Sequence, residues 1–305
     1  MRYTIFTPSY NRGYIIDKLY LSLKRQTFKD FEWIVINDGS TDNTDETFQR
    51  ILIEDNDLDI KYISKVNGGK HRAINDGVRM ATGELFFIVD SDDFLPDNAL
   101  EIINCWEKSI PPKDKSKYCG VCGLRFSAAN QKIIGTTFDG DYIDCTCLER
   151  PLHNITGDKA EVVYTQILKN YTFPEFDGEN FMTECIVWDK MAFDGYKFRF
   201  FNEAVYYGDY LSDGLSHNSK IFTSNPKGWG LCIYQSIMFG KISKYDIWKE
   251  YLKYYYELNG KISTKEISRN LHVSPILFRV LLFSVLQNKR IGYFLNKLTF
   301  LIASK

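Results

Sequence analysis

Short apolar runs and amphipathic stretches alternate regularly along the first 90 residues. The apolar runs, rich in β-branched and aromatic residues, predict strands at 3–8, 31–38, 59–64 and 84–90. Between them, apolar residues recur at helical spacing, which predicts helices at 14–26, 39–52 and 68–81. This alternation predicts an α/β fold, a mostly parallel sheet with helices on both faces.

From about residue 113 the pattern becomes less regular. Apolar runs predict strands at 118–127, 132–138 and 197–201 and a helix at 183–196, whereas 139–180 is rich in turn-forming residues. After Pro226 helical spacing returns, most clearly at 245–258 and 273–286. We therefore expect one domain over 1–225, with halves at 1–112 and 113–225, followed by a helical appendage over 226–305.

Polar clusters follow three of the predicted strands, at 7–12, 38–40 and 90–93. Ligands of open α/β sheets bind beyond the carboxyl ends of the strands, so these clusters should converge on one crevice. The last cluster, "DSDD", places three carboxylates within four positions. Such carboxylates raise one another's pKa unless positive charge lies among them, and a divalent cation is the simplest source of that charge. The plainer alternative, a cap for a helix at 97–106, needs one aspartate.

Composition indicates an ordinary globular protein of 305 residues, 44% of them apolar. The N-terminus lacks the apolar core of a secretory signal, and no window reaches the ~18 consecutive apolar residues of a spanning helix. We therefore expect a cytoplasmic location. A nicotinamide dehydrogenase is disfavoured because no G-x-G-x-x-G follows the first strand, and nothing resembles a module that reads nucleic-acid bases.

Charge is distributed unevenly along the chain. Residues 241–305 contain 12 Lys or Arg and 4 Asp or Glu, whereas residues 1–240 contain 26 and 35. The C-terminal region therefore favours an anionic surface as its partner.

The seven cysteines are an odd number, so a disulfide framework is not expected. The pairs Cys119–Cys122 and Cys145–Cys147 would together offer four zinc ligands. The second pair lacks the usual spacing, and small buried apolar residues are the alternative interpretation.

Four motifs in the N-terminal half resemble those of family 2 inverting glycosyltransferases with the GT-A fold, which is Rossmann-like. They are "TPSYNR" at 7–12, "NDGSTDNT" at 37–44, "NGGKHRAINDGVRMATGE" at 67–84 and "DSDDFLPD" at 90–97. The resemblance is strong over about the first 110 residues and weaker to about 220. It implies a nucleotide-sugar donor and a Mn²⁺ or Mg²⁺ cofactor.

The resemblance assigns roles within "DSDD". Asp92 is the expected metal ligand and Asp93 a second candidate, while Asp90, with Ser91 beside it, faces the ribose or a metal-bound water. Hard divalent cations take carboxylate and phosphate oxygens, which agrees with this assignment.

The other motifs would bind the rest of the donor. Asp38 resembles the family's uracil-binding aspartate, with a helix N-cap as the alternative. Thr7, Pro8 and Tyr10 would line the base, although Tyr10 could equally face the core. Asn11 and Arg12 would approach the nucleotide.

The third motif would serve the diphosphate. Lys70, after two glycines at a helix start, would approach it, and Asn75 would bind the donor. The chain departs from the commonest family pattern in having Ile74, not Arg, before Asn75. Lys70 or Arg72 would supply the missing charge, and an ordinary solvated helix residue is the alternative for both.

An inverting transfer needs a general base on the acceptor hydroxyl. In the resemblance, Thr183 and Glu184 stand where the family has an acidic pair, so Glu184 is the expected base, with Glu179 and Asp177 as fallbacks. A first-turn acid favoured by the helix dipole is the plain alternative for Glu184. His217 is a further candidate for contact with the metal or diphosphate, or else an ordinary surface residue.

Residues 273–305 mix an apolar stripe with Arg and Lys, as an interfacial helix does, so they are expected to bind anionic membrane or else to pack on the catalytic domain. A peripheral place on the inner face of the cell membrane would follow from the first alternative. We therefore expect a metal-dependent inverting hexosyltransferase that uses a UDP-sugar and a saccharide or polyprenyl-diphosphate-linked saccharide acceptor, in capsule, O-antigen or exopolysaccharide synthesis. The rivals are a polyprenyl-phosphate glycosyltransferase and a catalytically silent sugar- or nucleotide-binding protein.

Overall fold

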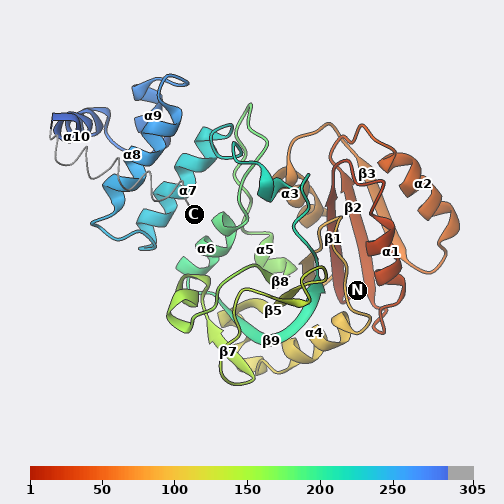
Figure 1. The fold of residues 1–305 in the computed structure, drawn as a ribbon. Coiled ribbons are helices and arrows are strands. Elements are labelled where there is room, and N and C mark those ends of the chain that lie inside the picture. Colours follow the sequence, from red (N-terminus) through yellow and green to blue (C-terminus); the bar gives the residue numbers. More distant parts are fainter. Residues whose placement is uncertain (288–305) are drawn as a thin grey trace. The chain divides into compact units, whose positions relative to one another are not determined.

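The computed structural model describes residues 1–287. The chain divides into two compact units, and the boundary between them in the sequence follows Ile221. The first unit, residues 1–221, is built on one mixed sheet flanked by helices (Figure 1). Its strands are β1 (Tyr3–Ser9), β2 (Phe31–Asn37), β3 (Asp59–Ser64), β4 (Leu85–Ile88), β5 (Tyr118–Ser127), β6 (Lys132–Ile134), β7 (Tyr142–Cys145), β8 (Lys159–Tyr164) and β9 (Lys197–Tyr207). Its helices are α1 (Asp17–Lys24), α2 (Thr44–Glu54), α3 (Lys70–Met80), α4 (Ala99–Lys108), α5 (Thr165–Leu168) and α6 (Cys185–Phe193), with 3₁₀ turns η1 (Pro112–Lys117), η2 (Cys147–His153) and η3 (Leu215–His217).

Strand order in this sheet is β3-β2-β1-β4-β8-β5-β9-β7, with β6 beside β5. The first four strands pair in parallel, as the alternating pattern predicts. The second half is mixed, because β8 runs antiparallel to both β4 and β5 while β9 runs parallel to β5. The sheet as a whole is therefore mixed, and the prediction of a mostly parallel sheet holds for its N-terminal half.

Helices cover both faces of the N-terminal strands, with α1 and α2 on one side and α3 on the other in Figure 1. The main core lies between the sheet and the α1, α2 side, where Trp33, Phe48 and Phe87 are fully buried. On the opposite face α3 lies close to the sheet at Gly77, where a Cβ would stand 2.2 Å from the Phe6 ring. A side chain at position 77 would push α3, and the residues at its N-terminus, away from the strands.

The turn-rich stretch 139–180 contains the strand that joins the two halves of the sheet. β8 lies between β4 and β5, so it is central, although the sequence pattern did not predict it. The strand predicted at 197–201 extends to Tyr207, and this extension brings Tyr206 beneath the acidic cluster that follows β4.

The second unit contains α7 (Pro226–Met238), α8 (Ile247–Leu258), α9 (Thr264–Asn270) and α10 (Pro275–Gln287). Tyr254, Leu258, Ile267 and Phe278 form its own small apolar core. Within the described part of the chain, no helix has the length and apolarity needed to cross a membrane. Residues 288–305, which complete the predicted basic tail, lie outside the described residues.

Candidate active site

The three predicted polar clusters lie together at the carboxyl edge of β1, β2 and β4. The backbone N–H of Asp38 donates to the Ser9 carbonyl (2.8 Å), and the Arg12 guanidinium lies 3.6 Å from the Asp92 carboxylate. Asn11 holds a left-handed backbone conformation (φ 53°), and its side-chain oxygen accepts from the Thr41 N–H (2.7 Å). These contacts join the loops that follow β1, β2 and β4 into one crevice.

Lys70 joins the two halves of this crevice. Its ammonium lies 2.6 Å from Asp90 and 2.7 Å from Glu184, the expected base. Burial alone would lower the pKa of Lys70, but these two carboxylates raise it on balance. Glu184 is placed by the N-terminus of α6, where it occupies the N-cap position.

Burial dominates the electrostatics of the acidic cluster. It would raise the pKa of Asp90, but Lys70 and Arg125 lower that pKa on balance. Burial and the charge of Asp90 raise the pKa of Asp92, and they raise the pKa of Asp93 to about 7. Ionising all three carboxyl groups is therefore unfavourable without further positive charge, and a bound cation would supply that charge.

Asp92 fits such a cation better than Asp93 does. The Asp92 carboxylate is partly exposed and lies at 3.6 Å from Arg12, which is longer than a hydrogen bond. The Asp93 carboxylate accepts from the Tyr206 hydroxyl (2.7 Å) and packs so tightly that a Cβ at Gly208 would lie 1.9 Å from it. Mg²⁺ is commonly held by one or two carboxylates together with substrate phosphates, so Asp92 with a donor diphosphate is a chemically sufficient set.

His217 does not complete that set. It lies exposed in η3, and among residues 1–287 no three His, Cys, Asp or Glu side chains are grouped so as to hold a metal ion. His217 is exposed to solvent, and its contact with the metal or diphosphate stays a prediction. Of the four cysteines considered as zinc ligands, Cys119, Cys122 and Cys145 are buried and Cys147 is partly buried, as small apolar residues of the core would be.

Asp38 fixes the loop that precedes α3. Its carboxylate accepts from the backbone N–H groups of Gly68 (2.9 Å) and Gly69 (2.7 Å), and the side chain is almost fully buried. Burial raises its pKa against the lowering effect of these two bonds. The N–H groups expected to face a diphosphate are thus bonded to Asp38. Each carboxylate oxygen has two acceptor positions, so a bond from a base remains compatible with this arrangement.

Asn75 and Arg72 have a different position from the one expected. The Asn75 side chain exchanges two hydrogen bonds with the Phe173 backbone, both 2.9 Å, and also donates to Glu175 (2.7 Å). Arg72 donates to the carbonyls of Gly68, Phe176 and Glu179 and contacts Glu175. Both residues anchor the segment 173–180 to α3. In this structure Asn75 therefore faces the segment 173–180, and its role in binding the donor stays a prediction. Arg72 is bonded to the same segment, so it is not the solvated helix residue of the alternative interpretation.

The residues expected around the base are divided between core and surface. Thr7 is buried, and its hydroxyl accepts from the Trp33 indole N–H (3.0 Å), so it faces the core and not the crevice. Pro8 and Ser91 are also buried, whereas Tyr10 is exposed, which excludes a core-facing Tyr10. Arg12 is held by Asp213 at 3.0 Å. Tyr10 thus stays accessible to a nucleotide, whereas the Arg12 side chain is mostly buried.

The alternatives to Glu184 are placed less favourably. Glu179 is buried, and its carbonyl accepts from Arg72. Asp177 lies in the same anchored segment, and Thr183 is partly exposed beside Cys185, with its hydroxyl 3.3 Å from that thiol. Glu184 forms an ion pair with Lys70 in the crevice (2.7 Å).

Three residues of the crevice carried no sequence signal. Arg125 on β5 donates to the Lys159 carbonyl (2.9 Å), packs over the Tyr206 ring (4.0 Å) and lies 3.8 Å from both Asp90 and Asp93. Burial raises the pKa of Glu161 on β8 to about 7. Arg125, Tyr206 and Glu161 come from strands β5, β9 and β8, whose pairing order local periodicity does not encode.

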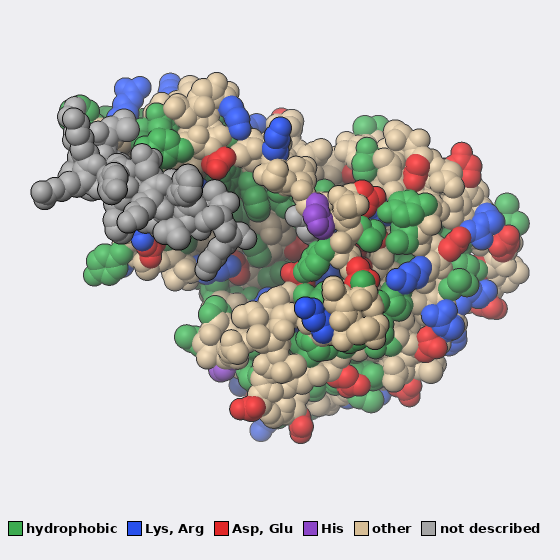
Figure 2. All heavy atoms as spheres, viewed as in Figure 1, with side chains coloured by type: hydrophobic (Ala, Val, Ile, Leu, Met, Phe, Trp, Pro, Cys, Tyr) green, Lys and Arg blue, Asp and Glu red, His purple; other side chains and the backbone are tan. Residues whose placement is uncertain are grey.

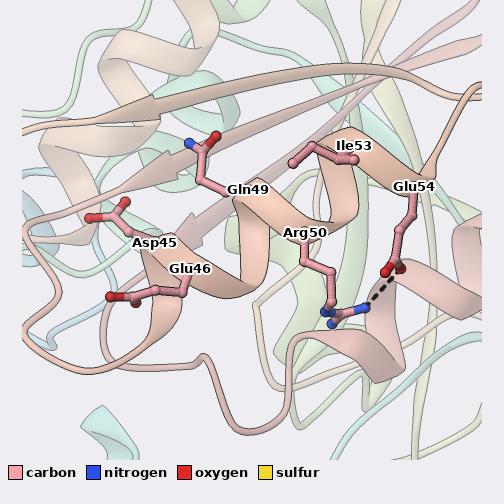
Figure 3. Close-up of a pocket in the computed structure, with 6 residues that line it drawn as sticks. All are labelled: Asp45, Glu46, Gln49, Arg50, Ile53 and Glu54. Carbon is pink, nitrogen blue, oxygen red and sulfur yellow. Dashed lines mark hydrogen bonds and ion pairs between the residues drawn. The ribbon is translucent and has the colours of Figure 1, made fainter.

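A separate surface hollow lies on the outer side of α2. It is lined by Asp45, Glu46, Gln49, Arg50, Ile53 and Glu54, and Arg50 pairs with Glu54 at 3.3 Å (Figure 3). None of the predicted site residues lines this hollow. On the face of residues 1–221 that Figure 2 shows, acidic and basic side chains are interspersed, so the acidic excess forms no single patch there.

The sequence model of "Glycosyl transferase family 2" matches residues 4–103. Glycosyltransferase GlyG of Streptococcus pneumoniae is 33% identical over 100 residues, which are 33% of this chain and 33% of that protein. Chondroitin synthase of Pasteurella multocida is 36% identical over 116 residues, 38% of this chain and 11% of that protein. A Campylobacter jejuni protein named GalNAc(5)-diNAcBac-PP-undecaprenol beta-1,3-glucosyltransferase is 33% identical over 104 residues, 33% of this chain and 32% of that protein. The matched region thus spans about a third or less of these curated relatives.

Solved structures extend the likeness to the whole fold. Staphylococcus aureus TarS 1–349 in complex with UDP-GlcNAc has a TM-score of 0.58 at 20% identity, covering 89% of this chain and 70% of that one. The mannosyltransferase PcManGT of Pyrobaculum calidifontis, in complex with GDP-Man and Mn²⁺, has a TM-score of 0.55 at 18% identity, covering 98% and 80%. At these identities the likeness concerns the fold, and it confirms the expected α/β class of the GT-A type.

Proposed function

We propose that the protein is a metal-dependent inverting glycosyltransferase that uses a UDP-sugar and a saccharide acceptor, because residues 4–103 match the sequence model of glycosyl transferase family 2. The main support for this proposal is the crevice, where the ammonium group of Lys70 pairs with both Asp90 and Glu184. It sets a candidate base directly beside the carboxylate cluster, as transfer from a bound donor requires.

The donor side of the crevice would bind the nucleotide. Asp38, oriented by Gly68 and Gly69, would accept from the base, and Tyr10 would cover it. Asp90 would face the ribose, and Arg12 and Lys70 would contact the phosphates. Asp92 would hold Mn²⁺ or Mg²⁺, which, when bound, offsets the charge that grows on the diphosphate leaving group.

The acceptor side would supply the base. Glu184 would accept the proton of the acceptor hydroxyl as that oxygen attacks the anomeric carbon from the face opposite the diphosphate. The attack forms the new glycosidic bond, breaks the bond to the diphosphate oxygen and inverts the anomeric centre. Arg72 and Asn75 support this geometry because they anchor the segment that leads into Glu184.

The pathway is proposed from the relatives. Their names include a polysaccharide synthase and a glucosyltransferase named for an undecaprenol-linked saccharide, which supports a saccharide or lipid-linked saccharide acceptor in capsule, O-antigen or exopolysaccharide synthesis. A polyprenyl-phosphate acceptor is the second candidate within the enzymes, and a silent nucleotide-binding protein is the rival outside them.

Calorimetric titration of UDP, GDP and CDP, with and without Mn²⁺, tests this proposal. We expect UDP to bind best and to need Mn²⁺, and Asp92→Asn to weaken that binding by more than roughly tenfold, since even partners of metal ligands contribute ~10–100-fold to metal affinity. Absence of nucleotide binding under every condition would refute the proposal. A Glu184→Gln variant that keeps UDP binding and loses ~10²–10⁴-fold in turnover would exclude the silent binder.

We also propose that the second unit associates with an anionic membrane surface. On α10, the side chains of Ile276, Leu277, Val280 and Phe283 are 77%, 59%, 60% and 65% exposed, while Phe278 on another face is buried. Residues 241–305, which include α10, contain 12 basic and 4 acidic residues. Exposed apolar side chains on successive turns in such a basic region are typical of an interfacial helix. The enzyme would then lie at the surface where lipid-linked acceptors reside.

A further inference from the structure

The ammonium of Lys70 is shared between a donor-side and an acceptor-side carboxylate. Asp90 follows β4 in the N-terminal half of the sheet, and Glu184 begins α6 far along the chain. Both lie within 2.7 Å of the same nitrogen, and all three side chains are about three-quarters buried. Charge-assisted hydrogen bonds of this length are strong, so the resting protein holds Glu184 against Lys70.

Two neighbouring cations, Arg72 and Arg125, are held in a different way. Arg72 donates mainly to backbone carbonyls, and Arg125 donates to the Lys159 carbonyl while lying 3.8 Å from its nearest carboxylates. The N–H groups of Gly68 and Gly69, at the start of α3, are bonded to Asp38. By contrast, the Lys70 ammonium pairs with two side-chain carboxylates of the crevice, so an arriving diphosphate can compete for it directly.

We propose that Lys70 moves from Glu184 to the donor diphosphate when the donor binds, and that this exchange releases Glu184 to act as the base. This inference rests on the proposed function. Before donor binding, the Glu184 carboxylate is paired with a cation and cannot turn freely to an acceptor hydroxyl. After the exchange it faces the acceptor unpaired. The donor must therefore bind first, and the acceptor second.

A double-mutant cycle on UDP binding tests the exchange without needing the acceptor. In the wild type, the diphosphate of UDP must displace Glu184 from its ion pair with Lys70. Glu184→Gln should therefore tighten UDP binding by roughly three- to tenfold in the presence of Mn²⁺, which is a usual size for coupling between neighbouring groups. In a Lys70→Met background the same Glu184→Gln change should leave UDP affinity unaltered. Uridine, which lacks phosphate, should bind equally to the wild type and to Glu184→Gln.

Glu175→Gln is the matched control, because Glu175 lies on the same anchored segment but pairs with Arg72. It should leave UDP affinity unchanged. Equal tightening by Glu184→Gln in the wild-type and Lys70→Met backgrounds would mean direct repulsion of UDP by Glu184 and would overturn the exchange, as would no tightening at all. UDP that fails to bind even the wild type would overturn the proposed function as well, so the two failures are distinguishable.

Discussion

Glu161 lies on β8 opposite Cys122 of β5, and the sequence gives no hint that its carboxyl group is unusual. Burial raises its pKa to about 7, the cations Arg125 and Arg150 oppose the rise, and the negative charge of Glu184 adds to it. The same cause, burial beside other acids, raises the pKa of Asp93. The chemistry of these carboxyl groups thus depends on their position in the crevice and not on their residue type.

Glu161 should make folding stability depend on pH. Its pKa is about 7 in the folded state and about 4.3 in an unfolded chain, so between these values the folded state holds the proton more tightly. Stability should therefore fall as pH rises from about 4 to about 7. The side chain at position 161 stays neutral in the Glu161→Gln variant. The free energy of unfolding of this variant, measured in urea and relative to the wild type, should therefore rise by about 1–3 kcal/mol from pH 5 to pH 8.

Glu203→Gln is the control for that measurement, because Glu203 is an exposed glutamate of the same sheet, on strand β9. Its stability should follow the wild type at both pH values. If the difference in free energy of unfolding between Glu161→Gln and the wild type is the same at pH 5 and pH 8, Glu161 has no raised pKa in the folded protein.

At the scale of elements, α3 connects the two halves of the crevice. Its first turn carries Lys70 and follows the loop bonded to Asp38, and its next turns carry Arg72 and Asn75, which hold 173–180. Gly69 makes this close approach possible, since it has a φ of 94° and a Cβ there would stand 1.8 Å from the Asn180 carbonyl oxygen. The loop bonded to Asp38 and the segment 173–180 are therefore both held by α3.

Asn75→Ala tests this support. Removing the buried amide leaves the Phe173 N–H and C=O without their partner, which should lower the free energy of unfolding by about 2 kcal/mol. Hydrogen exchange at residues 173–180 should accelerate, while UDP affinity should change less than about threefold, because Asn75 contacts the acceptor segment. Asn170→Ala, which removes an exposed amide bonded to Gln166, should alter neither quantity. A large loss of UDP affinity in Asn75→Ala would instead indicate that Asn75 binds the donor.

At the scale of the molecule, the chain divides into a sheet unit and a helical unit, each with its own core. The sheet unit contains all of the crevice residues, and the helical unit has the exposed apolar side chains of α10. Catalysis and membrane association are thus proposed for different units, so each can be removed by substitution without altering the other.

Sedimentation with vesicles tests the membrane proposal. The wild type should sediment with phosphatidylglycerol vesicles, more weakly at high salt, and not with phosphatidylcholine vesicles. Replacing Ile276, Val280 and Phe283 together by Ser should weaken this binding by at least roughly tenfold, since each buried apolar side chain contributes ~1.5–3 kcal/mol. The matched control replaces Ile53, Leu152 and Phe193, exposed apolar residues of the sheet unit, and should bind as the wild type does. Equal binding by both triple variants would refute a role for α10.

The sequence by itself determined the parallel half of the fold and the place of its crevice. Apolar periodicity predicted β1 to β4 and the helices between them, because a strand or helix that buries one face must repeat apolar residues at its own period. The position of "DSDD" at the end of β4 followed from the same pattern. Resemblance to the family then assigned roles to Asp92 and Glu184, which remain predictions.

Tertiary structure alone decided which side chains meet in that crevice. Lys70 reaches Glu184, Asn75 reaches Phe173, and Arg125 and Tyr206 surround Asp90 and Asp93, although each of these partners is distant in sequence. These contacts depend on β8 entering the sheet between β4 and β5, and on β9 beside β5. Periodicity reports whether a residue is buried, but strand order depends on the packing of the whole chain, so no local pattern encodes it.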